Sequence, residues 1–131
     1  MNKKVIGAEY CSRELCALLD KKGIEAHHVM AFVKSGSWYK KYTQDVVCRW
    51  LREKYRLQVD ADETTFFQER PKKIYYKWCP LIIRLSDCKI KLNSHNASQL
   101  DNDYICHNGG YCSSYEEARE LAIRYCVENL I

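Results

Sequence analysis

The chain has 131 residues, of which 47% are hydrophobic, 12% aromatic and 29% charged, and its formal net charge is +4. This length buries one modest core, and this apolar content excludes a disordered chain, so we expect a single domain spanning residues 1–131. The longest apolar patch, Leu81-Ile82-Ile83, is far short of the roughly 18 residues of a membrane span, and no export-type hydrophobic stretch follows Met1, so we expect a cytoplasmic location.

The first third of the chain predicts a helix followed by a hairpin. A serine-capped helix with leucines at helical spacing is expected over residues 12–22, and Gly23 is placed to end it. From residue 24 to residue 33 the β-branched and apolar content rises. The segment 35–37, Ser-Gly-Ser, can then turn the chain before the aromatic residues that begin at Trp38.

Two further helices and at least three strands are expected beyond this hairpin. Thr43 can cap a second helix, and Ser114 with a glutamate three residues later forms a capping box for the last one. Between them, residues 57–61, 74–78 and 90–92 alternate with the period of two that is typical of half-buried strands. Pro80 is expected to mark a break or a bulge, because proline cannot donate a hydrogen bond to a sheet ladder.

The hairpin-length connections between most of these elements favour an α+β fold. We expect three helices packed on one face of a small antiparallel or mixed sheet of three to five strands. The polar stretch 93–103 is expected to be an exposed loop.

The eight cysteines are expected to be reduced and, for the most part, packed in the core as small hydrophobic residues. Cys106, His107 and Cys112 lie close together in the sequence, but their spacing lacks the Cys-x-x-Cys pairs of structural zinc sites. A glycine-rich turn with incidental cysteines explains the segment better. We therefore expect no metal and no cofactor.

Basic residues concentrate in the middle of the chain and give one indication of function. The outward positions of the expected strands include Lys73, Tyr75, Lys77, Arg84, Lys89 and Lys91, and the segment with Trp38, Lys40 and Lys41 could extend the same surface. Lysines neutralise phosphates and aromatic rings stack on bases, so such a surface could bind nucleic acid. The alternative is that these lysines only keep an exposed sheet soluble.

A resemblance is carried by the helix Thr43-Gln44-Asp45-Val46-Val47-Cys48-Arg49-Trp50-Leu51-Arg52-Glu53-Lys54-Tyr55, the strand after it, and the opening of the last helix. These segments resemble small proteins encoded by phages and prophages of gut bacteria, a group with no assigned activity. The chain departs from that group in its many cysteines and in the polar stretch 93–103. The resemblance implies a compact α+β accessory protein and no catalytic residues.

No catalytic constellation, phosphate-binding glycine loop or nucleophile elbow occurs in the sequence, so we do not expect an enzyme. Two functions of different class are left open. The first is a non-catalytic accessory protein that binds another protein or forms a homodimer. The alternative is a nucleic-acid-binding accessory protein that uses the basic sheet face.

Overall fold

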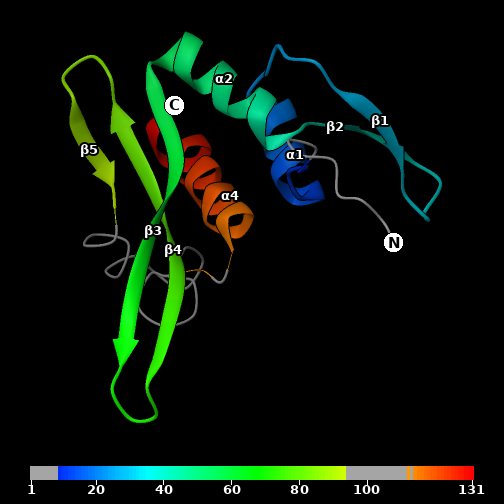
Figure 1. The fold of residues 1–131 in the computed structure, drawn as a ribbon. Coiled ribbons are helices and arrows are strands. Elements are labelled where there is room, and N and C mark those ends of the chain that lie inside the picture. The colour runs from blue at the N-terminus through cyan, green and yellow to red at the C-terminus, as the bar shows by residue number, and fades with distance from the viewer. Residues whose placement is uncertain (1–8, 94–111, 113) are drawn as a thin grey trace.

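Helices packed against small antiparallel sheets make up the structure, a computed structural model that describes residues 9–93, 112 and 114–131 (Figure 1). The elements are α1 (Arg13–Lys21), β1 (Val29–Phe32), β2 (Trp38–Lys41), α2 (Gln44–Tyr55), β3 (Leu57–Gln68), β4 (Lys73–Arg84), β5 (Lys89–Leu92), α4 (Tyr115–Tyr125) and the π-helical turn η1 (Cys126–Leu130). The expected α+β class is confirmed.

The strands form two sheets instead of the single sheet expected from the sequence. β1 and β2 make a two-stranded sheet, and β3, β4 and β5 make a three-stranded sheet in that order, with every pairing antiparallel. α4 packs on β3 and β4, α2 packs on β3, and α1 contacts β2. The β1–β2 hairpin therefore stands beside α1, away from the larger sheet (Figure 1).

All three expected helix caps are present. The Ser12 hydroxyl accepts a hydrogen bond from the N–H of Leu15 at 3.3 Å, and the Thr43 hydroxyl accepts one from Val46 at 3.2 Å. Ser114 accepts from the third residue after it at 3.1 Å. Each bond satisfies an N–H group that the first helical turn leaves unpaired, which fixes where the helix begins.

The expected break or bulge does not occur at Pro80 itself, because β4 continues through this residue in unbroken register with β3. The register shifts two residues later, between Ile82 and Ile83, in the pairing of β4 with β5. Pro80 lies opposite Ala61, whose N–H is bonded by the Asp60 carboxylate at 2.8 Å and therefore does not take part in the β3–β4 ladder. The nitrogen of Pro80 consequently faces the β5 side of the strand. β5 ends opposite Ile82, so no ladder hydrogen bond is lost there.

The core lies between the helices and the three-stranded sheet. Side chains from every helix and from both larger strands are buried in one cluster, which includes Leu15, Leu19, Val47, Leu51, Leu57, Val59, Ile82, Leu92, Ala122 and Ile123. Because the apolar positions of each helix lie three or four residues apart, each helix buries one stripe and exposes the rest. The hairpin β1–β2 contributes none of its own strand residues to the buried set.

Candidate interaction surface

The β1–β2 hairpin exposes large apolar side chains side by side. Met30 is 53% exposed, Phe32 58% and Trp38 62%, and we call these three residues the hairpin surface. In the register of the hairpin Phe32 lies opposite Trp38 and Met30 lies opposite Lys40. Opposite residues share a face of an antiparallel pair, and residues two apart in a strand do so as well, so the three apolar side chains lie on one face.

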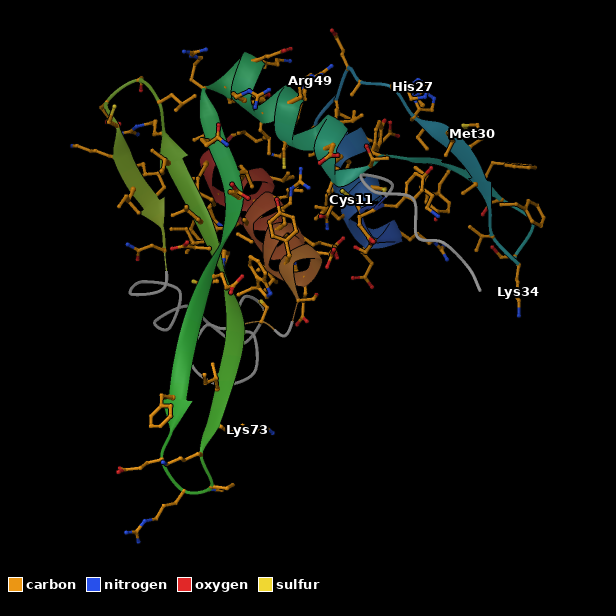
Figure 2. All side chains as sticks on the ribbon, in the orientation of Figure 1. Cys11, His27, Met30, Lys34, Arg49 and Lys73 are labelled. Carbon is orange, nitrogen blue, oxygen red and sulfur yellow. The ribbon has the colours of Figure 1, made fainter. Side chains whose placement is uncertain are left out.

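Two aromatic rings form the centre of the hairpin surface. The ring centroids of Phe32 and Trp38 are 5.1 Å apart and their planes are inclined by 59°. A single exposed apolar side chain is ordinary on a folded protein, whereas a contiguous exposed group marks a place where something binds. Figure 2 shows Met30 on the hairpin that projects beyond α1.

A groove of about 720 Å³ borders the hairpin surface on its α1 side. Its lining includes Ala17 and Leu18 from α1, together with Met30 and Trp38 from the hairpin. The apolar surface therefore continues from the strands into a concave region, which is the shape that a partner's side chain can fill.

The lysines of β2 are occupied by contacts within the chain. Lys40 forms an ion pair with Asp20 of α1 at 3.6 Å, and the Lys41 ammonium lies 4.4 Å from the centroid of the Tyr10 ring. β1, the outer strand of the hairpin, carries no charged residue at all. The two strands thus present apolar side chains, and the two lysines of β2 contact groups of the same molecule, whereas Lys34 in the turn is exposed.

The basic residues expected on the sheet are divided between two ends of β4. Lys73 and Lys77 share one face near its beginning, whereas Arg84 is out of phase with them and lies opposite Leu57 at its end. Along a strand, the seven positions from Lys77 to Arg84 span about 24 Å. The side chain of Tyr75 lies outside the described residues.

At the far end of β4 the positive charge is partly neutralised. Arg84 donates from Nε to both carboxylate oxygens of Asp87 at 3.1 Å, and these bonds lower the pKa of Asp87 to about 2. Lys89 pairs with Arg84 in the ladder, and its backbone N–H donates to the same carboxylate at 3.1 Å. Lys91 lies two residues after Lys89 on β5. Trp38 lies on β2, in the hairpin that stands apart from the sheet of β4 and β5 (Figure 1), so the structure does not gather it with the predicted basic residues on one face.

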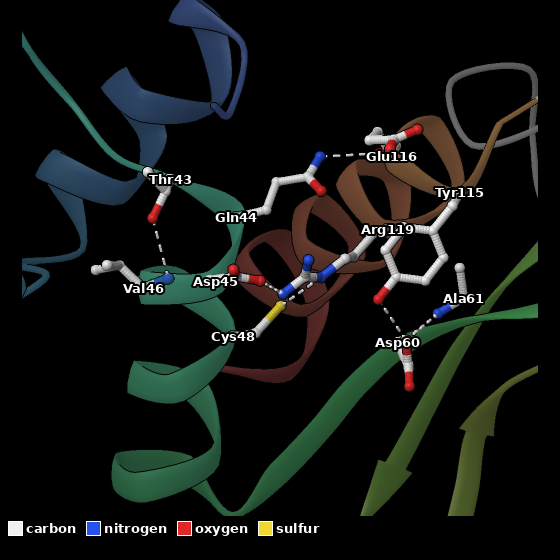
Figure 3. Close-up of polar contacts among 10 residues, drawn as sticks. All are labelled: Thr43, Gln44, Asp45, Val46, Cys48, Asp60, Ala61, Tyr115, Glu116 and Arg119. Carbon is white, nitrogen blue, oxygen red and sulfur yellow. Dashed lines mark hydrogen bonds and ion pairs between the residues drawn. The ribbon is translucent and has the colours of Figure 1, made fainter. Parts of the chain in front are cut away.

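Polar side chains form a joint between α2, α4 and β3, drawn in Figure 3. Arg119 donates to Asp45 and, from Nε, to the sulfur of Cys48 at 3.3 Å, and its guanidinium lies 5.6 Å from the Tyr115 ring centroid. The Tyr115 hydroxyl in turn donates to Asp60 at 3.0 Å. These groups bind one another, so the cluster connects the two helices to the sheet edge.

Burial raises the pKa of several thiols that the structure describes. Burial raises the pKa of Cys48 and outweighs the opposing effect of Arg119. Burial is also the largest effect on two other thiols. It raises the pKa of Cys79 to about 11 and the pKa of Cys126 to about 12. A nucleophilic cysteine needs a lowered pKa, so these thiols belong to the core.

The expectation that every cysteine is reduced is wrong for Cys112, which is disulfide-bonded. Cys16 and Cys126 are buried free thiols, as expected, and Cys88 is exposed. Cys106 and His107, considered above as metal ligands, lie outside the described residues, as does nearly all of the expected polar loop. Among the residues that are described, no group of three or more potential ligands could hold a metal ion.

Within the described ranges, no helix is both long and apolar enough to pass through a membrane. The cytoplasmic location expected from the sequence stays a prediction.

Comparisons of the chain with models of protein families, with characterised proteins and with solved structures find no match. The resemblance to small phage and prophage proteins therefore also stays a prediction. Among the described residues, the hairpin surface is the feature from which a function is proposed below.

Proposed function

We propose that this chain is a non-catalytic accessory protein that binds another protein chain through the hairpin surface. One observation carries the proposal: Met30, Phe32 and Trp38 share a face of a projecting hairpin, and each is more than half exposed. Tryptophan and other aromatic residues dominate the binding energy of protein interfaces, and they act from the centre of an apolar patch.

Burial of the hairpin surface would stabilise both the complex and the hairpin itself. Burying a side chain of this size is worth about 1.5–3 kcal/mol, so the three residues together supply enough to offset part of the entropy lost on association. A lone two-stranded hairpin is marginally stable in water. A partner that covers its exposed face would stabilise the binding element as well as the complex.

We expect Trp38→Lys to weaken association with the protein partner by about 30-fold or more, which corresponds to the roughly 2 kcal/mol of an interface hot spot. The complex is measured by chemical cross-linking and size-exclusion chromatography with light scattering. Trp38 is exposed in the free chain, so its replacement removes no core packing.

Phe67→Lys provides the matched control, because Phe67 is 67% exposed and lies on β3, far from the hairpin. The variant adds the same charge to the same kind of position. Equal complex formation by the wild type, Trp38→Lys and Phe67→Lys would rule out the hairpin surface as the binding element. Equal loss in both variants would point to net charge as the cause.

Nucleic-acid binding is the second candidate, and the pair Lys73 and Lys77 on one face of a projecting strand favours it. If it is correct, the affinity for labelled single- or double-stranded DNA or RNA falls steeply between low and moderate salt, because binding releases counterions from the phosphates. The triple variant Lys73→Glu, Lys77→Glu, Lys89→Glu would then abolish binding. Absent or salt-independent binding would eliminate this function.

A further inference from the structure

We infer that the partner of the hairpin is a second copy of this chain, which pairs its β1 with β1 of the first copy antiparallel about a two-fold axis at Ala31. The two hairpins, each a two-stranded sheet, then form one continuous four-stranded sheet. This inference rests on the proposed function of the hairpin surface and adds to it the identity and geometry of the partner.

The backbone of β1 is oriented for such pairing. Among the residues that the structure describes, β1 pairs only with β2, and no described strand lies along its other edge. The N–H of Val33 donates to the Ser37 carbonyl at 2.8 Å, which directs the backbone groups of Val33 toward β2. Because these directions alternate along an antiparallel strand, Ala31 also faces β2, while Met30 and Phe32 direct their N–H and C=O groups outward.

This other edge of β1 carries none of the features that prevent strands from pairing. Natural edge strands are protected by lysine, other inward-pointing charges, proline or bulges. Residues 26–33, Ala-His-His-Val-Met-Ala-Phe-Val, contain no lysine, arginine, aspartate, glutamate or proline. An unprotected edge with exposed apolar side chains is a template for another strand.

The side chains of this strand are self-complementary about Ala31. Residues 29–33, Val-Met-Ala-Phe-Val, read the same in both directions by size: β-branched, large, small, large, β-branched. A two-fold axis at Ala31 places Met30 of each copy opposite Phe32 of the other. The two outward-facing residues of each copy then exchange backbone hydrogen bonds, and the small Ala31 side chains meet at the axis.

Charge also favours a second copy over nucleic acid at this edge. No charged residue lies on β1, so two-fold pairing brings no like charges opposite each other. A phosphate backbone would need free cations along the edge. The neighbouring Lys40 and Lys41 of β2 instead contact Asp20 and the Tyr10 ring of their own chain, and the exposed Lys34 lies in the turn, beyond the end of β1.

The test combines two variants of the full chain. Met30→Pro removes an N–H that points away from β2, so the hairpin keeps its internal hydrogen bonds while the edge can no longer pair. We expect sedimentation velocity to give a dimer for the wild type and a monomer for Met30→Pro. The far-UV circular dichroism of the two proteins should agree.

The second variant is Ala31→Cys in a Cys88→Ser background, which removes the exposed native thiol. Opposite Cα atoms in a non-hydrogen-bonded pair are about 4.5 Å apart, which a disulfide can bridge, so mild oxidation is expected to give a covalent dimer. In Val29→Cys the two introduced cysteines are four positions out of register, about 14 Å apart along the strands, and no cross-link is expected.

The outcomes separate this inference from the proposed function. A monomeric wild type that binds another protein, with binding lost in Trp38→Lys, overturns the second copy but leaves the hairpin as the binding element. A dimer that survives Met30→Pro and is lost in Trp38→Lys overturns the edge pairing alone. Trp38 lies on β2, one strand away from the paired β1 edges. A dimer that is lost in Met30→Pro but survives Trp38→Lys therefore supports the edge pairing and overturns Trp38 as the binding centre of the hairpin surface. A dimer that survives both Met30→Pro and Trp38→Lys overturns the edge pairing and the proposed function together.

Discussion

Raising the pH from 8 to 10 is expected to lower the free energy of unfolding by about 4 kcal/mol, a large share of the roughly 5–15 kcal/mol that stabilises a domain. The cause is the ionisation of buried thiols, among which Cys11, Cys79 and Cys126 have the most strongly raised pKa values. Burial raises the pKa of all three, to about 11 for Cys79 and to about 12 for Cys126.

The direction of the effect follows from where the protons are bound. Below the ordinary thiol pKa of 9.0 the folded and unfolded chains both hold these protons, and the stabilisation is fully present. As the pH rises past 9, the unfolded chain releases the protons while the buried thiols keep them. Each thiol then costs about 1.4 kcal/mol of stability between pH 8 and pH 10.

Chemical denaturation at pH 8, 9 and 10 measures this loss. The double variant Cys11→Ala, Cys126→Ala removes two of these thiols, so its loss over the same range should be smaller by about 2.7 kcal/mol, even though its stability at pH 8 is lower. A wild-type stability that stays constant from pH 8 to pH 10 would show that these thiols are not buried.

Leu51→Ala is expected to destabilise the fold by about 2–5 kcal/mol, which is the range for truncating a fully buried leucine. Leu51 has no exposed surface and lies on the stripe of α2 that faces the core. The loss combines the transfer free energy of the deleted carbons with the cavity they leave. Urea or guanidinium unfolding at neutral pH gives the value.

Val29→Ala is the control for this truncation, because Val29 is 41% exposed and belongs to β1. Its effect on the monomer should stay below about 0.5 kcal/mol, as is usual for exposed sites. A Leu51→Ala variant as stable as the wild type would contradict the placement of α2 against the sheet.

Local signals determined the helices, and these were predictable from the sequence. The caps at Ser12, Thr43 and Ser114 involve residues three apart, so a short stretch of sequence contains the whole interaction. The left-handed residue that ends α2 was not predicted, because Arg56 has a φ of 57° and occupies a position that glycine or asparagine usually takes.

The arrangement of the strands depends on contacts between distant segments and was predicted less well. The period of two identified strands on both sides of Pro80, but it could not show that the ladder there leaves the proline nitrogen unpaired. Alternation likewise does not indicate which strands share a sheet. In the structure β2 packs beside α1, and the hairpin forms a sheet of its own.

The candidate surface was predicted in part. Trp38, Lys40 and Lys41 were singled out from the sequence, but as an extension of a basic face, and the structure shows both lysines in contacts within the chain. Met30 and Phe32 were missed, because an apolar residue in a strand reads as a core residue until its neighbours are known. The uncharged stretch 26–33 was the available signal.

Amide hydrogen exchange of the wild-type chain tests the central claim most directly. The N–H groups of Met30 and Phe32 point away from β2, whereas that of Ala31 points toward it, so Ala31 provides an internal reference. Protection of Met30 and Phe32 is expected to rise with protein concentration while Ala31 stays protected throughout. Rapid exchange at Met30 and Phe32 at every concentration would contradict pairing through the β1 edge.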